Sequence, residues 1–281
     1  DGMSGFSPEW LALREPADTA ARSPEVLVAL QQAFADRTSC RICDFGAGTG
    51  SSVRALAEYL PPRQDWLLVD YDAANINAAV DALSDWADVA ERQGDDLLLQ
   101  RAGRQLKVSF AVRDLAVAGD LLPEPADLVT ASALADLTSA AWLDRLVAEL
   151  RRHRVAVLAG LNYDGVMSFD PADPLDPAIR DAFNRHQTGD KGFGPALGPA
   201  AGNYLARRLA GNGFTVTTGD SPWRLDETTR DLMLATLGGI AGAAGETGLV
   251  DAAELNRWKK LRQAGPKAMT IGHLDVFACH P

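Results

Sequence analysis

The chain has 281 residues, of which 47% are hydrophobic and 23% charged, and its formal net charge is −11. This is ordinary globular composition, which excludes a disordered chain, and the acidic balance disfavours a nucleic-acid partner because such a surface repels phosphates. No apolar stretch approaches the roughly 20 residues that a membrane helix needs, so no membrane partner is expected.

Strand and helix patterns alternate through the first half of the sequence. Ser23 and Pro24 mark the start of a helix that runs to Phe34, within an N-terminal helical segment of residues 1–38. Five repeats of an apolar run and a helical pattern follow, which is typical of a doubly wound parallel sheet. The predicted strands cover 41–45, 66–69, 107–112, 126–131 and 155–159, and the predicted helices cover 52–60, 73–92 and 140–150.

The second half begins with an irregular stretch. Residues 161–200 are rich in Pro, Gly and Asp, and long connections of this kind are usually lids or binding loops, so we predict an insertion over the site. The alternation then resumes. The expected elements are a helix over 203–210, a strand over 214–218, two helices within 227–262 and a last strand over 270–279. We therefore expect one α/β domain over 39–281.

A glycine-rich turn follows the first strand. The strand RICDF leads to Gly46, Gly48 and Gly50, whose spacing lets the backbone turn tightly and approach a ligand. A dinucleotide-binding fingerprint would place the third glycine one position later, at Ser51. Asp44, just before the turn, suits a cationic amino group and not a pyrophosphate, although it could also cap the turn.

Two further acids end the next strands. Asp70 follows Gly50 by 20 residues, where it can accept hydrogen bonds from ribose hydroxyls, and Asp72 is the alternative for that role. Asp114 ends the third strand, where it is either an acceptor for an adenine amino group or a solvated carboxylate. Acids at successive strand ends around one glycine turn favour a cationic ligand that carries adenosine.

With these residues in place, the sequence resembles the class I S-adenosylmethionine-dependent methyltransferases. DFGAGTG, LLVDYD, VRDLA and DLVTASALADL are similar to their first four motifs, in order, over about residues 41–159. The resemblance implies a Rossmann-like, seven-stranded, mostly parallel sheet with an antiparallel last strand, helices on both faces, and S-adenosylmethionine as the cofactor. The cofactor residues that follow from the motifs and their flanks are Asp44, Gly46, Ala47, Gly48, Asp70, Tyr71, Asp114, Leu115 and Ser132.

The methyl acceptor is less clear from the sequence. The fourth motif lacks an (N/D)PP(Y/F) segment, which disfavours amino methylation of a nucleic-acid base, so we expect a small-molecule substrate methylated on oxygen, nitrogen or carbon. If the acceptor is a hydroxyl, a general base helps, and His186 within the insertion is our candidate. An ordinary surface-loop role is the alternative for His186.

Four other residues are candidates for contact with the methyl acceptor. Asn162 and Tyr163 follow the fifth strand, and ligands bind beyond the carboxyl ends of such strands, so we predict Tyr163 as a catalytic residue and Asn162 as a substrate-binding residue. Trp223 and Arg224 follow the sixth strand, where an aromatic plane and a bidentate donor can hold a carboxylate or phosphate. Core packing of Trp223 and a helix salt bridge of Arg224 are the alternatives.

The number and spacing of the cysteines indicate the redox state of the cellular compartment. Cys40, Cys43 and Cys279 are odd in number and irregularly spaced, so we expect free thiols, a reducing compartment and no metal site. The sequence also shows no basic start followed by an apolar segment, so a cytoplasmic location is expected. A homodimer stays open.

Two rival functions remain at this stage. A nicotinamide-dependent oxidoreductase also uses a glycine turn and an acid at the end of the second strand. A non-catalytic protein that keeps the fold and binds S-adenosylmethionine is the other, because a fold does not guarantee chemistry.

Overall fold

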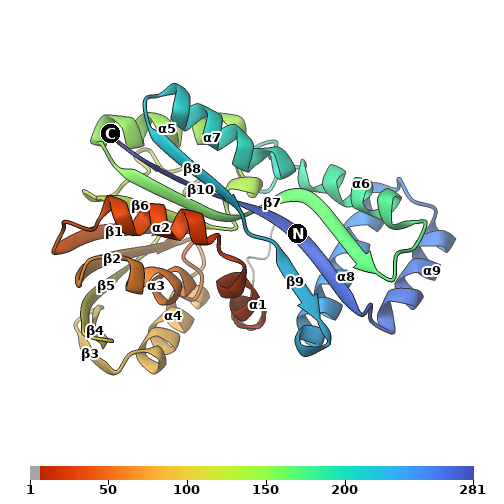
Figure 1. The fold of residues 1–281 in the computed structure, drawn as a ribbon, viewed down its shortest axis with the longest axis horizontal. Coiled ribbons are helices and arrows are strands. Elements are labelled where there is room, and N and C mark those ends of the chain that lie inside the picture. The colour runs from red at the N-terminus through yellow and green to blue at the C-terminus, as the bar shows by residue number, and fades with distance from the viewer. Residues whose placement is uncertain (1–6) are drawn as a thin grey trace.

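The computed structural model describes residues 7–281, so residues 1–6 of the predicted N-terminal helical segment lie outside the described residues. Its strands form one ten-stranded sheet (Figure 1). They are β1 Ser39–Phe45, β2 Arg63–Asp70, β3 Val89–Gln93, β4 Asp96–Arg101, β5 Arg104–Val112, β6 Leu128–Ser132, β7 Ala156–Asp170, β8 Thr215–Asp220, β9 Trp223–Asp226 and β10 Ala268–Cys279. The strand order is β3-β4-β5-β2-β1-β6-β7-β10-β8, and β9 pairs with the first half of β10.

Helices cover both faces of this sheet. They are α1 Pro8–Ala21, α2 Pro24–Ala33, α3 Ser51–Leu56, α4 Ala73–Trp86, α5 Ala140–His153, α6 Asp176–Gln187, α7 Ala201–Gly211, α8 Arg230–Thr247 and α9 Ala252–Gln263. One apolar core lies between the sheet and α2, α3 and α4, and a second lies between the sheet and α5 and α7 (Figure 1). The glycine turn that follows β1 thus begins at a buried strand end.

The predicted fold class is confirmed. The strands β5, β2, β1, β6 and β7 pair in parallel, and they contain the five strands expected from the first half of the sequence. The last strand, β10, runs antiparallel to β7 and β8 as the resemblance implied. The expected helix starting at Pro24 and the two helices within 227–262 are present as α2, α8 and α9.

Some details of the prediction are wrong. The helix expected over 73–92 ends at Trp86, and residues 89–101 form the hairpin β3–β4 instead. Asp88 begins this hairpin by accepting a hydrogen bond from the Ala102 amide at 2.8 Å, and the side chains of Leu97 and Leu99 are buried beside β5. With this hairpin and β9, the sheet has ten strands and not seven.

A second lobe extends from the carboxyl end of β7. The strand does not end near residue 159 but continues to Asp170, and it pairs along this length with β10. The helices α6, α8 and α9 pack against this extension around buried Ile179, Met233 and Trp258 (Figure 1). We call this part, residues 162–187 and 223–271, the C-terminal lobe. The predicted insertion at 161–200 therefore contributes a strand end, α6 and a loop.

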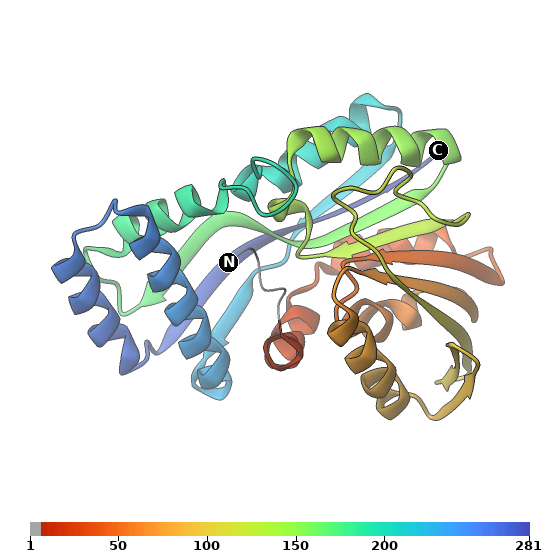
Figure 2. The ribbon, with the colours of Figure 1, turned by 180° about the vertical axis from the view of Figure 1, so that it is seen from behind.

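Helix α1 lies in the angle between the two parts of the molecule. It contacts α4 on one side and β9 and α8 of the C-terminal lobe on the other (Figure 2). Its start is specified locally, since the Ser7 hydroxyl accepts a hydrogen bond from the Trp10 amide and Pro8 occupies the first turn. This placement brings one face of α1 to the glycine turn.

Candidate functional site

A cavity of about 480 Å³ lies at the carboxyl ends of β1, β2, β5 and β6. Eight of the nine predicted cofactor residues line it, the exception being Asp44. We call the lining residues at the strand ends the strand-end wall: Gly46, Ala47, Gly48, Thr49, Ser51, Ser52, Asp70, Tyr71, Asn75, Arg113, Asp114, Leu115, Ala116 and Ser132. The opposite side, the helix wall, comprises Leu11, Arg14, Asp18, Gln187, Lys191, Gly192 and Phe193.

The glycine turn has a backbone conformation that residues other than glycine rarely adopt. Gly46, Gly48 and Gly50 all have positive φ, and that of Gly48 is +54°. A Cβ atom at Gly48 would lie 2.9 Å from Leu11 Cδ1 of α1, so a larger residue there would be strained and would also press on the helix wall. The absence of side chains at these glycines therefore lets both helix α1 and a ligand in the cavity come close to the backbone of the turn.

Asp70 ties this turn to the second strand. Its Oδ2 accepts a hydrogen bond from the Gly48 amide at 2.8 Å, and its Oδ1 accepts one from the Asp72 amide at 2.9 Å. Burial raises the pKa of Asp70, and the two backbone hydrogen bonds oppose that rise. Asp72, the alternative for the same role, instead caps α4 by accepting from the Ala74 amide, and it does not line the cavity.

The third acid also occupies a strand end at the cavity. Asp114 lines the cavity, and its Oδ1 accepts a hydrogen bond from the Ala116 amide at 2.9 Å. The neighbouring Leu115 is buried, and its carbonyl accepts a hydrogen bond from Trp142 Nε1 at 2.9 Å. These contacts fix the loop after β5, so an apolar side chain and an acid line the cavity together.

Asp44 lies beneath the strand-end wall and not on it. Only 1% of the residue is exposed, and its Oδ1 accepts a hydrogen bond from the Thr130 hydroxyl at 2.7 Å. Burial raises the pKa of Asp44 to about 7, while the neighbouring hydroxyls of Thr130 and Ser52 oppose the rise. Its Oδ2 is buried and accepts no hydrogen bond from residues 7–281.

Two serines connect Asp44 to a buried arginine. The hydroxyls of Ser52 and Ser132, which both line the cavity, are 3.3 Å apart, and Arg22 Nη2 donates to Ser132 Oγ at 3.0 Å. Burial lowers the pKa of Arg22, and the carboxylates of Asp275, Asp18 and Asp44 oppose this. Its Nε and Nη1 are buried and donate to no acceptor within the described chain. We call Asp44, Ser52, Ser132 and Arg22 the polar floor.

The helix wall is held by charged pairs on α1. Arg14 donates from Nε and Nη2 to the carboxylate of Asp18 at 2.8 and 3.2 Å. Glu15, on the same helix, accepts two hydrogen bonds of 2.6 Å from Arg54 of α3, which also donates to the Thr49 carbonyl in the glycine turn. Sequence reasoning missed these residues. The Ser7–Pro8 start predicts a helix there, but not the side that faces the cavity.

Trp223 lies behind this helix wall. Its Nε1 donates to Asp18 Oδ1 at 2.8 Å, and the Arg14 guanidinium lies 4.9 Å from its ring centroid. Trp223 is buried, whereas Arg224 is exposed because successive side chains of β9 point to opposite faces. The structure thus brings Trp223 to the back of the site and does not bring Arg224 to the cavity.

Asn162 and Tyr163 are buried inside the long strand β7. Asn162 Nδ2 donates to the carbonyls of Ala159 and Leu274, and the Tyr163 hydroxyl donates to Asn184 Oδ1 at 2.7 Å. Burial raises the pKa of Tyr163. Neither residue lines the cavity, so the structure places both in the packing between β7, β10 and α6.

His186 lies near the end of α6, next to the cavity but not on its wall. Its Nε2 is 2.8 Å from Glu246 Oε2 of α8, and its Nδ1 is 3.3 Å from the Nζ atom of Lys191. Lys191 and Gln187 line the cavity, whereas His186 does not. His186, the predicted base, therefore does not line the space that a ligand would occupy, but it contacts Lys191, which does.

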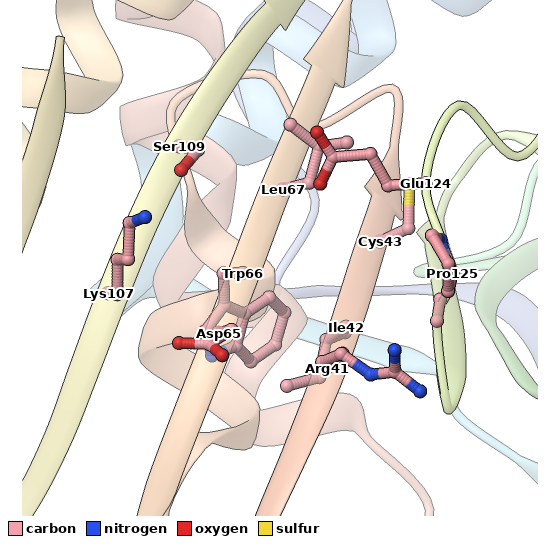
Figure 3. Close-up of a pocket in the computed structure, with 11 residues that line it drawn as sticks. Arg41, Ile42, Cys43, Asp65, Trp66, Leu67, Lys107, Ser109, Glu124 and Pro125 are labelled. Carbon is pink, nitrogen blue, oxygen red and sulfur yellow. The ribbon is translucent and has the colours of Figure 1, made fainter.

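A smaller hollow of about 170 Å³ lies on the sheet over the middle of β1, β2 and β5 (Figure 3). Its two cationic side chains are already paired, since Arg41 contacts Asp127 and Lys107 contacts Asp96. Within residues 7–281, no group of three or more His, Cys, Asp or Glu side chains is placed to hold a metal ion. In the same range, no helix combines the length and apolarity that a membrane crossing requires.

Solved structures resemble this fold. No protein-family model matches the sequence, and no curated protein matches it. A Bacillus halodurans structure described as a putative methyltransferase aligns with a TM-score of 0.50 at 12% identity, covering 91% of this chain and 98% of the other. The chain has the class I methyltransferase fold. The resemblance seen in the sequence motifs is thereby confirmed at the level of the fold.

Two more distant structures were also found. A putative type II methyltransferase from Anaeromyxobacter dehalogenans aligns at 19% identity with a TM-score of 0.45, covering 92% of this chain and 96% of the other. The magnesium protoporphyrin IX methyltransferase of Synechocystis PCC 6803, solved with bound SAM, aligns at 15% identity with a TM-score of 0.43 and covers 79% of each chain.

Proposed function

We propose that this chain is an S-adenosylmethionine-dependent methyltransferase that acts on a small-molecule acceptor. The observation that carries the proposal is that Gly48, Asp70, Asp114 and the two serines of the polar floor line one cavity, with Asp44 and Arg22 buried beneath those serines. These residues offer hydrogen-bond acceptors for a nucleoside at one end of the cavity, and a carboxyl group and a guanidinium group beneath the other end. A nucleoside joined to an amino acid matches it.

The polar floor fits the amino-acid part of the cofactor. Asp44 Oδ2 lacks a hydrogen-bond donor and Arg22 Nε and Nη1 lack an acceptor within residues 7–281, and buried polar atoms of this kind are costly unless a ligand or water satisfies them. The hydroxyls of Ser52 and Ser132 face the cavity and link these charges to it. We therefore assign the ammonium and carboxylate groups of the cofactor to this floor.

The strand ends fit the nucleoside part. We assign the ribose hydroxyls to Asp70 and the adenine ring to Asp114 and Leu115, with Tyr71 at the rim of the cavity. Each carboxylate oxygen of Asp70 already accepts one backbone hydrogen bond and has a second lone pair for a hydroxyl. The backbone contacts fix the orientation of the carboxylate before a ligand arrives.

The competing oxidoreductase function fits the same cavity less well. A dinucleotide would place a pyrophosphate at the glycine turn, and the buried acid Asp44 beneath Ser52 would repel it. The third glycine also stands at Gly50 and not at Ser51. Both features disfavour a dinucleotide, and the carboxyl group of Asp44 favours a ligand with a positive charge at this place.

S-adenosylmethionine, when bound, supplies a methyl group activated by its sulfonium. The residues of this chain then have to align the acceptor and exclude water. Leu11, Leu134 and Phe193 give the cavity apolar walls that serve the second task. A base that removes a proton from the acceptor is not part of the proposal, because neither His186 nor Tyr163 lines the cavity.

Turnover with a panel of small metabolites tests this function. The protein is incubated with S-adenosylmethionine and each candidate, and release of S-adenosylhomocysteine is measured, with Gly48→Val as the inactive control. We expect release with at least one small acceptor. Binding of S-adenosylhomocysteine without turnover across a broad panel would instead favour the non-catalytic alternative, and reduction of NAD with any panel member would favour the oxidoreductase.

A further inference from the structure

The loop that follows α6 brings one lysine to the cavity. Lys191 and Phe193 line it, and the loop is fixed because Asp190 Oδ1 accepts hydrogen bonds from the amides of Gly192 and Gly194 at 2.7 and 3.1 Å. The Phe193 ring packs edge-on against Trp142 with centroids 5.3 Å apart. Lys191 is therefore carried by an ordered loop and not by a free surface segment.

His186 of the C-terminal lobe contacts the side chain of Lys191, and Glu246 contacts the other side of the His186 ring. His186 Nε2 lies 2.8 Å from Glu246 Oε2, and its Nδ1 lies 3.3 Å from Lys191 Nζ. The tautomer with its proton on Nε2 donates to Glu246 and accepts from Lys191. Both ring nitrogens are then engaged. His186 connects a carboxylate of α8 to an ammonium at the cavity.

Lys191 differs from Arg14, the other cation of the helix wall, in that it has no carboxylate partner within the described chain. Arg14 is paired with the carboxylate of Asp18. Lys191 contacts the His186 ring, and within residues 7–281 it forms no ion pair with a carboxylate. A half-buried ammonium without a carboxylate partner is stabilised by an anionic ligand.

We infer that Lys191 anchors an anionic group of the methyl acceptor, a carboxylate or a phosphate, and that His186 is the positioning residue of this anchor. The inference rests on the proposed function, since it assumes that the cofactor fills the strand-end wall. Leu134, Leu137 and Phe193 line the same cavity, so the acceptor carries an apolar body beside its anionic group. The acceptor class is thus a small amphipathic acid.

Binding of simple aromatic probes tests the anchor without knowledge of the acceptor. Benzoate and phenyl phosphate provide the two anionic groups, and benzamide is the neutral control of similar shape. Each is titrated against the protein saturated with S-adenosylhomocysteine and followed by ligand-observed NMR. We expect at least one anion to bind roughly tenfold more tightly than benzamide, because hydrogen bonds to charged groups are strong. The stronger of the two anions identifies the acceptor's head group.

Substitutions test whether Lys191 is the residue that produces the preference for an anionic probe. Lys191→Met should remove the roughly tenfold preference for the anion, and Lys191→Arg should keep most of it. Lys259→Met, which removes an exposed lysine on α9 outside the cavity, should bind the probes as the unmodified protein does. An equal preference for benzoate in Lys191→Met and in the unmodified protein would overturn the proposal.

Two substitutions of His186 test its positioning role through their effects on anion affinity. In His186→Asn the side-chain oxygen lies near the place of Nδ1 and can still accept from Lys191, whereas His186→Ala cannot. We expect the alanine variant to lose about threefold in anion affinity and the asparagine variant to restore it, with benzamide binding unchanged in both. Equal losses in the two variants would contradict the role.

Binding of S-adenosylhomocysteine separates the two proposals. The unmodified protein and Lys191→Met should bind it within about twofold of one another, since Lys191 lies on the helix wall. If the unmodified protein does not bind it, the proposed function fails. The same probe titrations without it then decide the anion site alone, and a lost preference in Lys191→Met would still support that site.

Discussion

The two walls of the cavity are built from different kinds of sequence information. The strand-end wall comes from residues that directly follow β1, β2, β5 and β6, so its members lie within one stretch of the chain, 46–132. The helix wall joins α1 to the loop at 187–193, two segments that are far apart in the sequence. The first wall follows from a rule about parallel sheets, whereas the second depends on tertiary packing.

The largest effect is expected at Gly48, where the two walls meet. Gly48→Val combines strain at a φ of +54° with a Cβ atom 2.9 Å from Leu11 Cδ1. We expect the affinity for S-adenosylhomocysteine, measured by calorimetry, to fall by more than about a hundredfold. Gly94→Val is the matched control, because Gly94 also has a positive φ but nothing lies within 4 Å of its added Cβ. Equal losses in both variants would mean that strain alone, and not contact between the walls, explains the effect.

Asp70 should give the next largest effect and Asp72 almost none. Asp70→Ala removes an acceptor for two backbone amides and for the proposed ribose contact, so affinity for S-adenosylhomocysteine should fall by about tenfold to a hundredfold. Asp72→Ala removes only the cap of α4 and should lower the free energy of unfolding by about 1 kcal/mol. If Asp72→Ala weakens binding as much as Asp70→Ala, the assignment of the ribose to Asp70 is incorrect.

Asp44 predicts a pH-dependent stability. Its pKa in the folded protein is about 7, above the ordinary value of 3.8, so the folded state retains a proton that the unfolded chain has lost between these values. The folded state is therefore destabilised progressively as pH rises from about 4 to 7. Relative to the unmodified protein, Asp44→Asn should gain about 1–3 kcal/mol more stability at pH 8 than at pH 5, measured by chemical unfolding.

The same residue predicts a pH-dependent affinity. The ionised carboxylate favours the ammonium group of the cofactor, so binding of S-adenosylhomocysteine should strengthen several-fold between pH 6 and pH 8, by up to about tenfold. In Asp44→Asn this dependence should vanish and the affinity at pH 8 should be lower. A variant that is both less stable and unchanged in binding would assign Asp44 to the fold and not to the site.

The smallest effect is expected where α1 is fastened to the glycine turn. Glu15→Gln weakens the ion pair with Arg54, whose atoms are 2.6 Å apart and whose side chains are largely buried. The loss of about 0.5–1 kcal/mol should speed dissociation of S-adenosylhomocysteine by about twofold to fivefold in stopped-flow measurements. Glu9→Gln, an exposed position on the same helix, is the control. A similar change in both would exclude a specific role for the pair.

The sequence predicts the body of the fold well, because its parallel strands are apolar runs, of which β1, β2, β6 and β7 are largely buried. The edge hairpin was not predicted, since all five residues of β3 are exposed and its sequence VAERQ continues the helical pattern before it. The length of β7 was also missed. Asn162 and Tyr163 were expected beyond a strand end near residue 159, but pairing with β10 extends the strand and buries them in its interior.

Eight residues of the strand-end wall were predicted from the motifs, and the ninth predicted residue, Asp44, lies under the wall. The helix wall was not predicted, because the positions of Arg14, Asp18 and Lys191 depend on how α1 and the C-terminal lobe pack on the sheet. His186 was singled out as a titratable residue in a glycine-rich segment. The sequence carries no signal that Lys191 lies between its ring and the cavity.

Calorimetric titration of the unmodified protein with S-adenosylhomocysteine and, separately, with NADH tests the central claim most directly. The polar floor and the acids at the strand ends predict one tight site for S-adenosylhomocysteine and no heat of binding for NADH. Binding of NADH with none for S-adenosylhomocysteine would contradict the account.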